Sequence, residues 1–329
     1  MNLVPESVPP QKPRMLTFRS GGWILLLAGA LMAATLTWHI ATIVPTLGGP
    51  AIGDGKNVET YGFDLSTCLV PRDLIVAGGA LIRKNGMPAM VDPATLPVSR
   101  VVDGSKLAGV QKLTPSDRVI GVVVGGEARA YPLWVLTWHE IVNDTLAGEP
   151  ILVTYSPLCD AAVVFDRTVD GETIEFRHSG LLFNSNLLMY DQRADDAAES
   201  LWSQLQSRAV AGPAAQRAAV LDVRGCLVVP WAEWRERYPD STVVLPDPER
   251  KKVYRRKAYS HYFGNEKLMF PVRPLPERSG RLLKARVVAS RRDGVWNVSD
   301  AADFSPARDW SEHATVYAFW FAWNAMHAE

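Results

Sequence analysis

The chain has 329 residues, which is enough for one large domain or two modest ones with a sizeable core. A hydrophobic fraction of 47% and a charged fraction of 21% are typical of a globular protein and exclude a largely disordered chain. The formal net charge is zero, so composition gives no argument for nucleic-acid binding. The three cysteines, Cys68, Cys159 and Cys226, are too few and too scattered for a disulfide scaffold.

The N-terminal segment has the pattern of a membrane anchor. Residues 1–20 contain Lys12, Arg14 and Arg19, whereas residues 21–44 contain no charged residue. A helix of that length spans a hydrocarbon core of about 30 Å. Positive charge before the apolar segment predicts that residues 1–20 are a cytoplasmic tail. We therefore expect a single-pass protein of the cell (inner) membrane, with the lipid bilayer as partner and the main domain periplasmic or extracellular.

A cleaved signal peptide is the alternative for this segment, because Ala28, Gly29 and Ala30 form a small-residue site. The apolar run continues well past these residues, which favours an uncleaved anchor. Residues 45–57 are rich in Gly and Pro and are predicted to be a linker, followed by an exoplasmic domain over residues 58–329.

The exoplasmic domain shows short strand patterns and few long helices. β-Branched and apolar runs predict strands at 119–124, 151–155 and 162–165, and Gly125–Gly126 predicts a hairpin turn before 128–131. We predict an α+β fold with a β-rich core and short helices, preceded by one transmembrane helix. The expected helices are a short one beginning near Pro132 and continuing through Asp144, one at 230–238 and a buried terminal one at 315–326.

Ligand-type and acid/base side chains are concentrated between residues 130 and 167. Imidazole nitrogen and thiolate sulfur are favoured ligands of copper and zinc, so His139 and Cys159 are the candidate metal ligands, with copper preferred. Glu140 is the candidate acid/base residue, and Asn143, four positions after His139 on the expected helix, is a candidate binding residue. The alternative is structural: His139 packs under Trp138, and Cys159 is a small buried hydrophobe.

Four further positions are candidate binding residues. Asn184, Ser185 and Asn186 lie between apolar runs and are interpreted either as a polar site floor or as a turn. His261 lies among aromatic and basic residues, which suits a pocket with aromatic walls. His178 follows a strand pattern and could complete a metal shell, although a surface position is expected.

Residues 249–292 are strongly basic, with fourteen Lys or Arg against three Glu. An exoplasmic domain rarely meets nucleic acid, so we expect no nucleic-acid partner. A solvated, internally paired face or attraction to an anionic membrane surface fits better. Any protein partner is left unidentified by the sequence.

Several ordered motifs resemble the DUF3179 family of exported or membrane-anchored bacterial and archaeal proteins, whose function is uncharacterised. They are WHEIVND, SGLLFNSNLLMYDQ, SLWSQL and WAEWRERYPD, with FDLSTCLVPRDLIVAGG and MPAMVDP before them and FPVRPL and AFWFAW after them. The family pattern commonly has T-Y-C-P-L-C where this chain has Ser156 as the first of the two thiol positions. The resemblance therefore implies a site at this turn, but an internal disulfide there is impossible. Ser156 is a further candidate binding residue.

Three functions remain open from the sequence. The first is a transition-metal site that uses His139 and Cys159. The second is a non-metal enzyme or small-molecule binder in the same cleft, with proton transfer by His139 and Glu140. The third is a partner- or lipid-binding module that presents the basic and aromatic C-terminal third.

Overall fold

The structure is a computed structural model of the chain, which divides into two compact units, Met1–Gly49 and Pro50–Glu329. Most of the predicted anchor at 21–44 and the first part of the predicted linker lie outside the described residues. No helix within the described residues is long and apolar enough to cross a membrane. The structure describes Ile24, 27–29, 31–32, 51–80, 82–254, 258–277 and 280–328.

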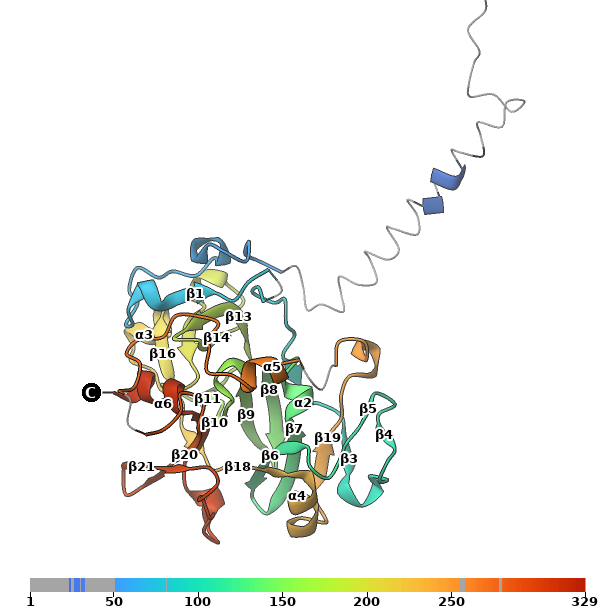
Figure 1. Ribbon diagram of the computed structural model, residues 1–329. Coiled ribbons are helices and arrows are strands. Elements are labelled where there is room, and N and C mark those ends of the chain that lie inside the picture. Colours follow the sequence, from blue (N-terminus) through green and yellow to red (C-terminus); the bar gives the residue numbers. More distant parts are fainter. Residues whose placement is uncertain are drawn as a thin grey trace, which may run out of the picture. The chain divides into compact units, whose positions relative to one another are not determined.

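The unit Pro50–Glu329 is rich in β-strands and has only short helices, as predicted (Figure 1). Its largest sheet, called the central sheet below, runs in the order β2 (Met90–Val91), β8 (Ile141–Leu146), β9 (Glu149–Ser156), β10 (Ala161–Asp166), β22 (Thr315–Phe319), β20 (Arg286–Arg292) and β21 (Val295–Asp300), and β17 (Val223–Arg224) also pairs with β10. One flanking sheet runs in the order β1 (Ile75–Ala77), β13 (Phe176–Phe183), β14 (Asn186–Asp191), β15 (Leu201–Ser203) and β16 (Arg208–Ala211). The other runs in the order β18 (Leu227–Pro230), β6 (Arg118–Val124), β7 (Glu127–Pro132), β19 (Thr242–Val244) and β3 (Thr95–Pro97).

The remaining elements are short. Two strand pairs are β4 (Lys106–Leu107) with β5 (Gln111–Lys112), and β11 (Thr168–Val169) with β12 (Glu172–Thr173). The helices are α2 (Leu133–Leu136), α3 (Pro213–Gln216), α4 (Trp231–Arg237), α5 (Ser260–Phe263) and α6 (Trp320–His327). Single 3-10 turns occupy Val58–Tyr61, Arg72–Leu74, Val98–Arg100, Pro157–Cys159, Asp196–Ala198, Pro248–Arg250 and Trp310–Glu312.

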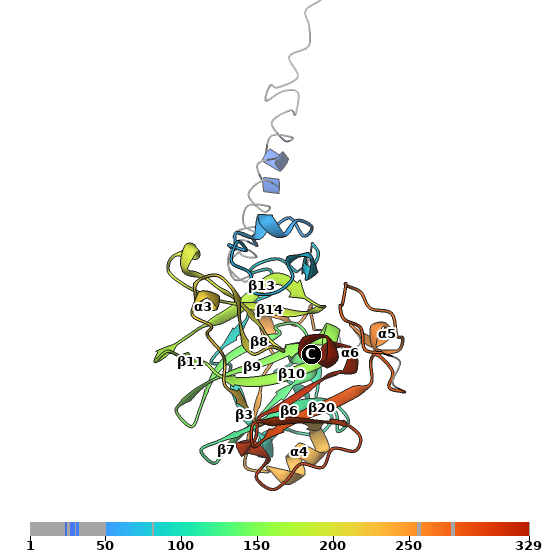
Figure 2. The same cartoon turned by 90° about the vertical axis from the view of Figure 1, so that its left-hand side faces the viewer.

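The middle strands of the central sheet, β8, β9, β10 and β22, are largely buried on both faces. In β9, Ile151 and Val153 belong to the core shared with β6 and β7, whereas Leu152 belongs to the core shared with β13 and β14. Side chains alternate between the two faces of a strand, so a strand between two layers needs apolar residues in succession. Figure 2 shows β13 and β14 on one side of β8–β10 and β6 on the other. The uninterrupted apolar run of β9 follows from this position.

Two of the helix predictions need correction. The helix that begins after Pro132 ends at Leu136, and the following residues form strand β8 instead of a helical continuation. Strand β8 forms because its apolar residues pair with β9, with Ile141 opposite Thr154. The predicted terminal helix is half strand: β22 comes first, and α6 begins only at Trp320. The helix predicted at 230–238 is confirmed as α4.

A glycine in β6 permits the close packing of α4 on the sheet. A Cβ atom at Gly121 would lie 1.9 Å from Cζ3 of Trp234, whose ring is fully buried. The Trp234 indole is fixed from its other end, because its Nε1 donates to Ser241 Oγ at 3.0 Å. The ring therefore has no simple way to move aside.

We expect Gly121→Ala to lower the free energy of unfolding by about 3 kcal/mol, because the added methyl group overpacks the site. Urea unfolding of parent and variant is the measurement. Gly264→Ala is the matched control: its Cβ would make an ordinary 3.4 Å contact, so stability should change little. Equal stability of the two variants would contradict the packing described here.

Candidate functional site

A buried carboxylate–imidazole pair lies between the central sheet and the β13–β14 sheet. Glu140 directly precedes β8, and its Oε2 lies 3.1 Å from Nε2 of His178 on β13. The other ring nitrogen of His178 accepts the backbone N–H of Gly180 at 2.9 Å. The proton of the His178 ring therefore resides on Nε2 and is donated to Glu140. Glu140 is 4% exposed and His178 is 1% exposed, so the surface position expected for His178 is wrong.

The thiol of Cys159 lies in the same cluster. Cys159 ends the Pro157–Cys159 turn, is fully buried and donates to the backbone oxygen of Ser185 at 3.3 Å. Burial raises the pKa of the Cys159 thiol well above its ordinary value, and the negative charge of Glu140 raises it further. The side chains of Ser156 and Asn186 are polar neighbours that act in the opposite direction. The structure thus brings together Glu140, Ser156, Cys159 and Asn186 from the sequence-predicted set.

Three residues of this region have left-handed backbone conformations, which also occur at several positions elsewhere in the described chain. Glu140 has a φ of 56°, and Asn184 and Ser185 in the β13–β14 turn have φ values of 51° and 64°. Non-glycine residues pay about 1–3 kcal/mol each for sparsely populated backbone conformations, and such residues gather at functional sites. Glu140, with its left-handed backbone, is the residue directly before strand β8.

Asn184 and Ser185 form hydrogen bonds with the backbone of residues 270–273. The side-chain amide of Asn184 donates to the backbone oxygen of Arg273 and accepts its N–H, both at 2.9 Å. The Ser185 hydroxyl donates to the backbone oxygen of Phe270 at 3.1 Å. The Tyr262 hydroxyl donates to the backbone oxygen of Leu158 at 3.0 Å. These two predicted binding residues therefore connect the site to the α5 region.

His139 is turned away from Cys159. Its Nδ1 lies 2.9 Å from the backbone oxygen of Pro88, which can only accept, so Nδ1 donates. Its Nε2 lies 2.7 Å from the hydroxyl of Tyr254, which in turn accepts the backbone N–H of Asp247. Metal binding by His139 would require one of these contacts to be exchanged. The pairing of His139 with Cys159 as metal ligands stays a prediction.

The other predicted binding residues serve different places. Asn143 forms a pair of hydrogen bonds with the backbone of Phe176, 2.8 Å from its N–H and 2.9 Å from its oxygen, and so connects β8 with β13. Asn186 donates to the side-chain oxygen of Gln204 at 2.8 Å. His261 is exposed and lines a separate surface pocket of about 360 Å³.

The site contains side chains that can bind a metal ion, but too few of them lie together to form a metal site. Among the described residues, no group of three or more His, Cys, Asp or Glu side chains is arranged to hold a metal. Glu140 contacts His178, and its charge acts on the Cys159 thiol, but these three side chains do not form such a group.

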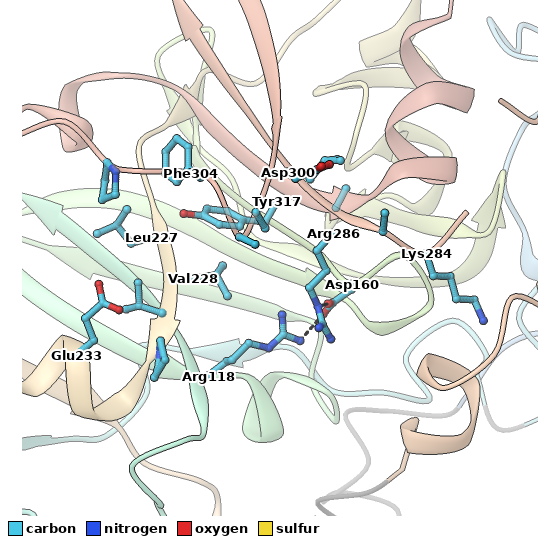
Figure 3. Close-up of a pocket in the computed structure, with 18 residues that line it drawn as sticks. Arg118, Asp160, Leu227, Val228, Glu233, Lys284, Arg286, Asp300, Phe304 and Tyr317 are labelled. Carbon is cyan, nitrogen blue, oxygen red and sulfur yellow. Dashed lines mark hydrogen bonds and ion pairs between the residues drawn. The ribbon is translucent and has the colours of Figure 1, made fainter. Parts of the chain in front are cut away.

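Sequence reasoning missed Asp160, the residue after Cys159. Its carboxylate accepts hydrogen bonds from Arg118 at 2.7 Å and from Arg286 at 2.5 Å (Figure 3). It also accepts one from the Tyr155 hydroxyl at 2.6 Å. Asp160 is 3% exposed, and although burial opposes ionisation, the arginines hold its pKa below the ordinary value. Asp160 has a left-handed backbone with φ of 43°, a property of the folded chain that the sequence does not reveal.

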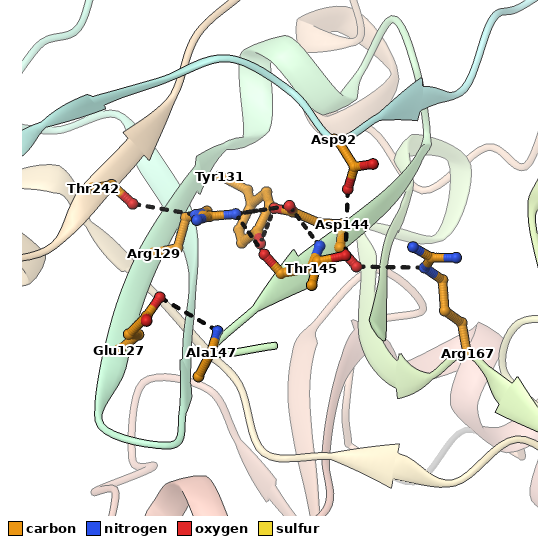
Figure 4. Close-up of polar contacts among 9 residues, drawn as sticks. All are labelled: Asp92, Glu127, Arg129, Tyr131, Asp144, Thr145, Ala147, Arg167 and Thr242. Carbon is orange, nitrogen blue, oxygen red and sulfur yellow. Dashed lines mark hydrogen bonds and ion pairs between the residues drawn. The ribbon is translucent and has the colours of Figure 1, made fainter. Parts of the chain in front are cut away.

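Asp144 forms a second buried polar centre (Figure 4). Its carboxylate accepts from Arg129 Nη1 at 2.7 Å to each oxygen, from the Tyr131 hydroxyl at 2.7 Å and from the Thr145 N–H at 2.8 Å. The neighbouring backbone oxygen accepts from Arg167 at 3.4 Å. The contacts with Arg129, Tyr131 and Arg167 join β8 to neighbouring parts of the chain, so we assign Asp144 a structural role.

Comparison with known families matches residues 84–297 to the family described as "Protein of unknown function (DUF3179)". The resemblance predicted from the sequence motifs is thereby confirmed over more than half of the chain. No curated protein and no solved structure matches the chain.

Burial lowers the pKa of His139 from 6.5 to about 4, against the opposing effect of the Pro88 contact. Between these values the unfolded chain binds a proton that the folded chain excludes. Stability should therefore be fully present above pH 6.5 and fall by up to about 3 kcal/mol as the pH is lowered to 4. We expect His139→Gln to have a flatter pH dependence of urea unfolding in this window.

The exposed His261→Gln is the control for this comparison and should follow the parent. Because carboxylates also titrate at low pH, the difference between the two variants carries the result. Identical pH dependence in His139→Gln and the parent would contradict the buried, uncharged state of His139.

Proposed function

The chain belongs to the DUF3179 family of proteins of unknown function, and we propose that its outer domain binds a small molecule beside Glu140 and exchanges a proton with it. The observation that supports this proposal is the Glu140–His178 pair, buried and joined at 3.1 Å next to the thiol of Cys159. Burying such groups costs free energy, and apolar residues of similar volume would often be equally stable there, which favours a functional role for this pair.

Glu140 is the proton-transfer residue in this proposal, and His178 is its positioning residue. His178 presents a single N–H to Glu140, because the Gly180 N–H occupies its other nitrogen. A carboxylate fixed in this way keeps its second oxygen available to a ligand. Burial raises the pKa of the Cys159 thiol. Cys159 therefore lines the site as a neutral thiol and does not act as a thiolate nucleophile.

A copper or zinc ion is the second candidate occupant of the same cluster. The observation that favours it is the proximity of a soft sulfur donor, Cys159, to the Glu140 carboxylate. Binding would require the metal to displace the proton of the thiol. The metal–sulfur bond would offset the raised pKa of Cys159. His139 joins this set only if it leaves Tyr254 or Pro88.

We also propose that residues 21–44 anchor this domain in the cell membrane with the domain on the outer side. The uncharged segment and the preceding Lys12, Arg14 and Arg19 support this topology.

For the anchor, we expect the full chain to stay with membranes after an alkaline carbonate wash. A chain that begins at residue 45 should be released by the same wash. The measurement is immunoblotting of the pellet and supernatant. Release of the full chain would remove the anchor from the proposal.

For the site, the three free cysteines provide an internal comparison of access. Cys159 and Cys226 are both fully buried, whereas Cys68 is partly exposed. If a small molecule reaches the cluster, methyl methanethiosulfonate should modify Cys159 faster than Cys226 and more slowly than Cys68. Glu140→Gln should speed the reaction of Cys159 about threefold to tenfold, because loss of the negative charge lowers the thiol pKa. Peptide mass spectrometry gives the three rates.

Equal rates at Cys159 and Cys226 would mean that only unfolding exposes the cluster, and the proposal would fail. The same experiment tests whether a copper or zinc ion occupies the cluster. If Cys159 becomes reactive only after treatment with a chelator, and copper or zinc is released in proportion, the metal replaces the small molecule as the occupant. A Cys159→Ser variant that retains the metal would exclude that reading.

A further inference from the structure

A cavity lies on the side of the central sheet that faces β6 and β18, away from Cys159. It measures about 690 Å³, a size within the range of small-molecule sites. Its walls come from β18, from the β20 and β22 strands of the central sheet, and from the loop after β21. Its apolar lining includes Leu227, Val228, Phe304 and Tyr317 (Figure 3).

The charged side chains in this cavity leave one positive charge uncompensated. Glu233 pairs with Arg237 at 3.4 Å, and Asp300 pairs with Arg281 at 2.9 Å. Lys284 turns away from the cavity, and its ammonium donates to three backbone oxygens at 2.6–2.8 Å.

Two arginines then share a single carboxylate. Arg118 and Arg286 both bind Asp160, so the three charges sum to one positive charge. Within the part of the chain that the structure describes, the side-chain hydrogen bonds of Arg286 go to Asp160 alone. A guanidinium has five N–H donors, and the side chain of Arg286 is 48% exposed, so several donors face the cavity.

We propose that this cavity binds an organic monocarboxylate with an apolar body. The carboxylate would lie on Arg286 and Arg118, because guanidinium presents a planar donor fork that matches it. The apolar body would lie against Phe304 and Tyr317, whose rings meet edge to face at 6.1 Å. This site is separate from the Glu140 cluster and does not depend on the function proposed for it.

The test is isothermal titration calorimetry of the purified full chain with three probes of one shape. These are 4-phenylbutyrate, the neutral 4-phenylbutyramide and the cationic 4-phenylbutylamine. We expect saturable one-to-one binding of 4-phenylbutyrate, binding of the amide weaker by about tenfold or more, and no binding of the amine. Absence of saturable binding of 4-phenylbutyrate at millimolar concentration, or equal binding of acid and amide, would overturn the proposal.

Variants assign the contacts. Arg286→Gln should weaken 4-phenylbutyrate by about tenfold and leave the amide unchanged, since only the charge-assisted contact is lost. Phe304→Ala should weaken both probes to the same extent. Arg217→Gln, at an exposed arginine that pairs with Asp170, is the matched control and should bind as the parent does. Thermal unfolding of each variant separates loss of binding from loss of fold, and unchanged binding in a folded Arg286→Gln variant would also overturn the proposal.

Discussion

The fold depends on a sheet that is buried on both faces. A polar side chain in such a strand must find a partner inside the protein, because water cannot supply one. Asn143 on β8 satisfies this by binding the backbone of Phe176 as a neighbouring strand would. Thr154 on β9 donates to the backbone oxygen of Val163 and accepts from Gln204, both at 2.8 Å. These contacts fasten the central sheet to the β13–β14 sheet in one relative position.

The same constraint makes the turn between β9 and β10 unusual. Cys159 belongs to the core on the β13 side, whereas the next residue, Asp160, binds Arg118 from β6. Consecutive residues therefore face opposite layers, and one short turn contributes Cys159 to the Glu140 cluster and Asp160 to the arginine cavity.

The strands were predictable where local composition decided the structure. The runs at 119–124 and 151–155 are rich in β-branched residues, and β6 and β9 contain them. The stretch from His139 to Asp144 was not predictable, since its polar spacing suits a helix. His139 and Glu140 instead lie outside regular structure, and only pairing with β9 makes the residues from Ile141 onward a strand.

The sites were predictable only in part, because their partners are distant in sequence. Glu140 and Cys159 were found from residue chemistry, but His178 is 38 positions from Glu140 and has no motif that connects them. Asp160 binds Arg118 and Arg286, at 42 and 126 positions. A pairing of that kind follows from topology, which a single sequence does not contain.

Ser156 stands where the family pattern commonly has the first cysteine of the turn. The Ser156 side chain is a polar neighbour of the Cys159 thiol, so the first position of the turn lies against the second. In the pattern that this chain resembles, two thiols would meet there, suited to a disulfide or to a pair of metal thiolates. A hydroxyl keeps the hydrogen-bonding contact but neither exchanges electrons with the thiol nor supplies a second soft donor. The chemistry left to this chain is therefore centred on Glu140, whose partner His178 and whose strained backbone are unaffected by the replacement.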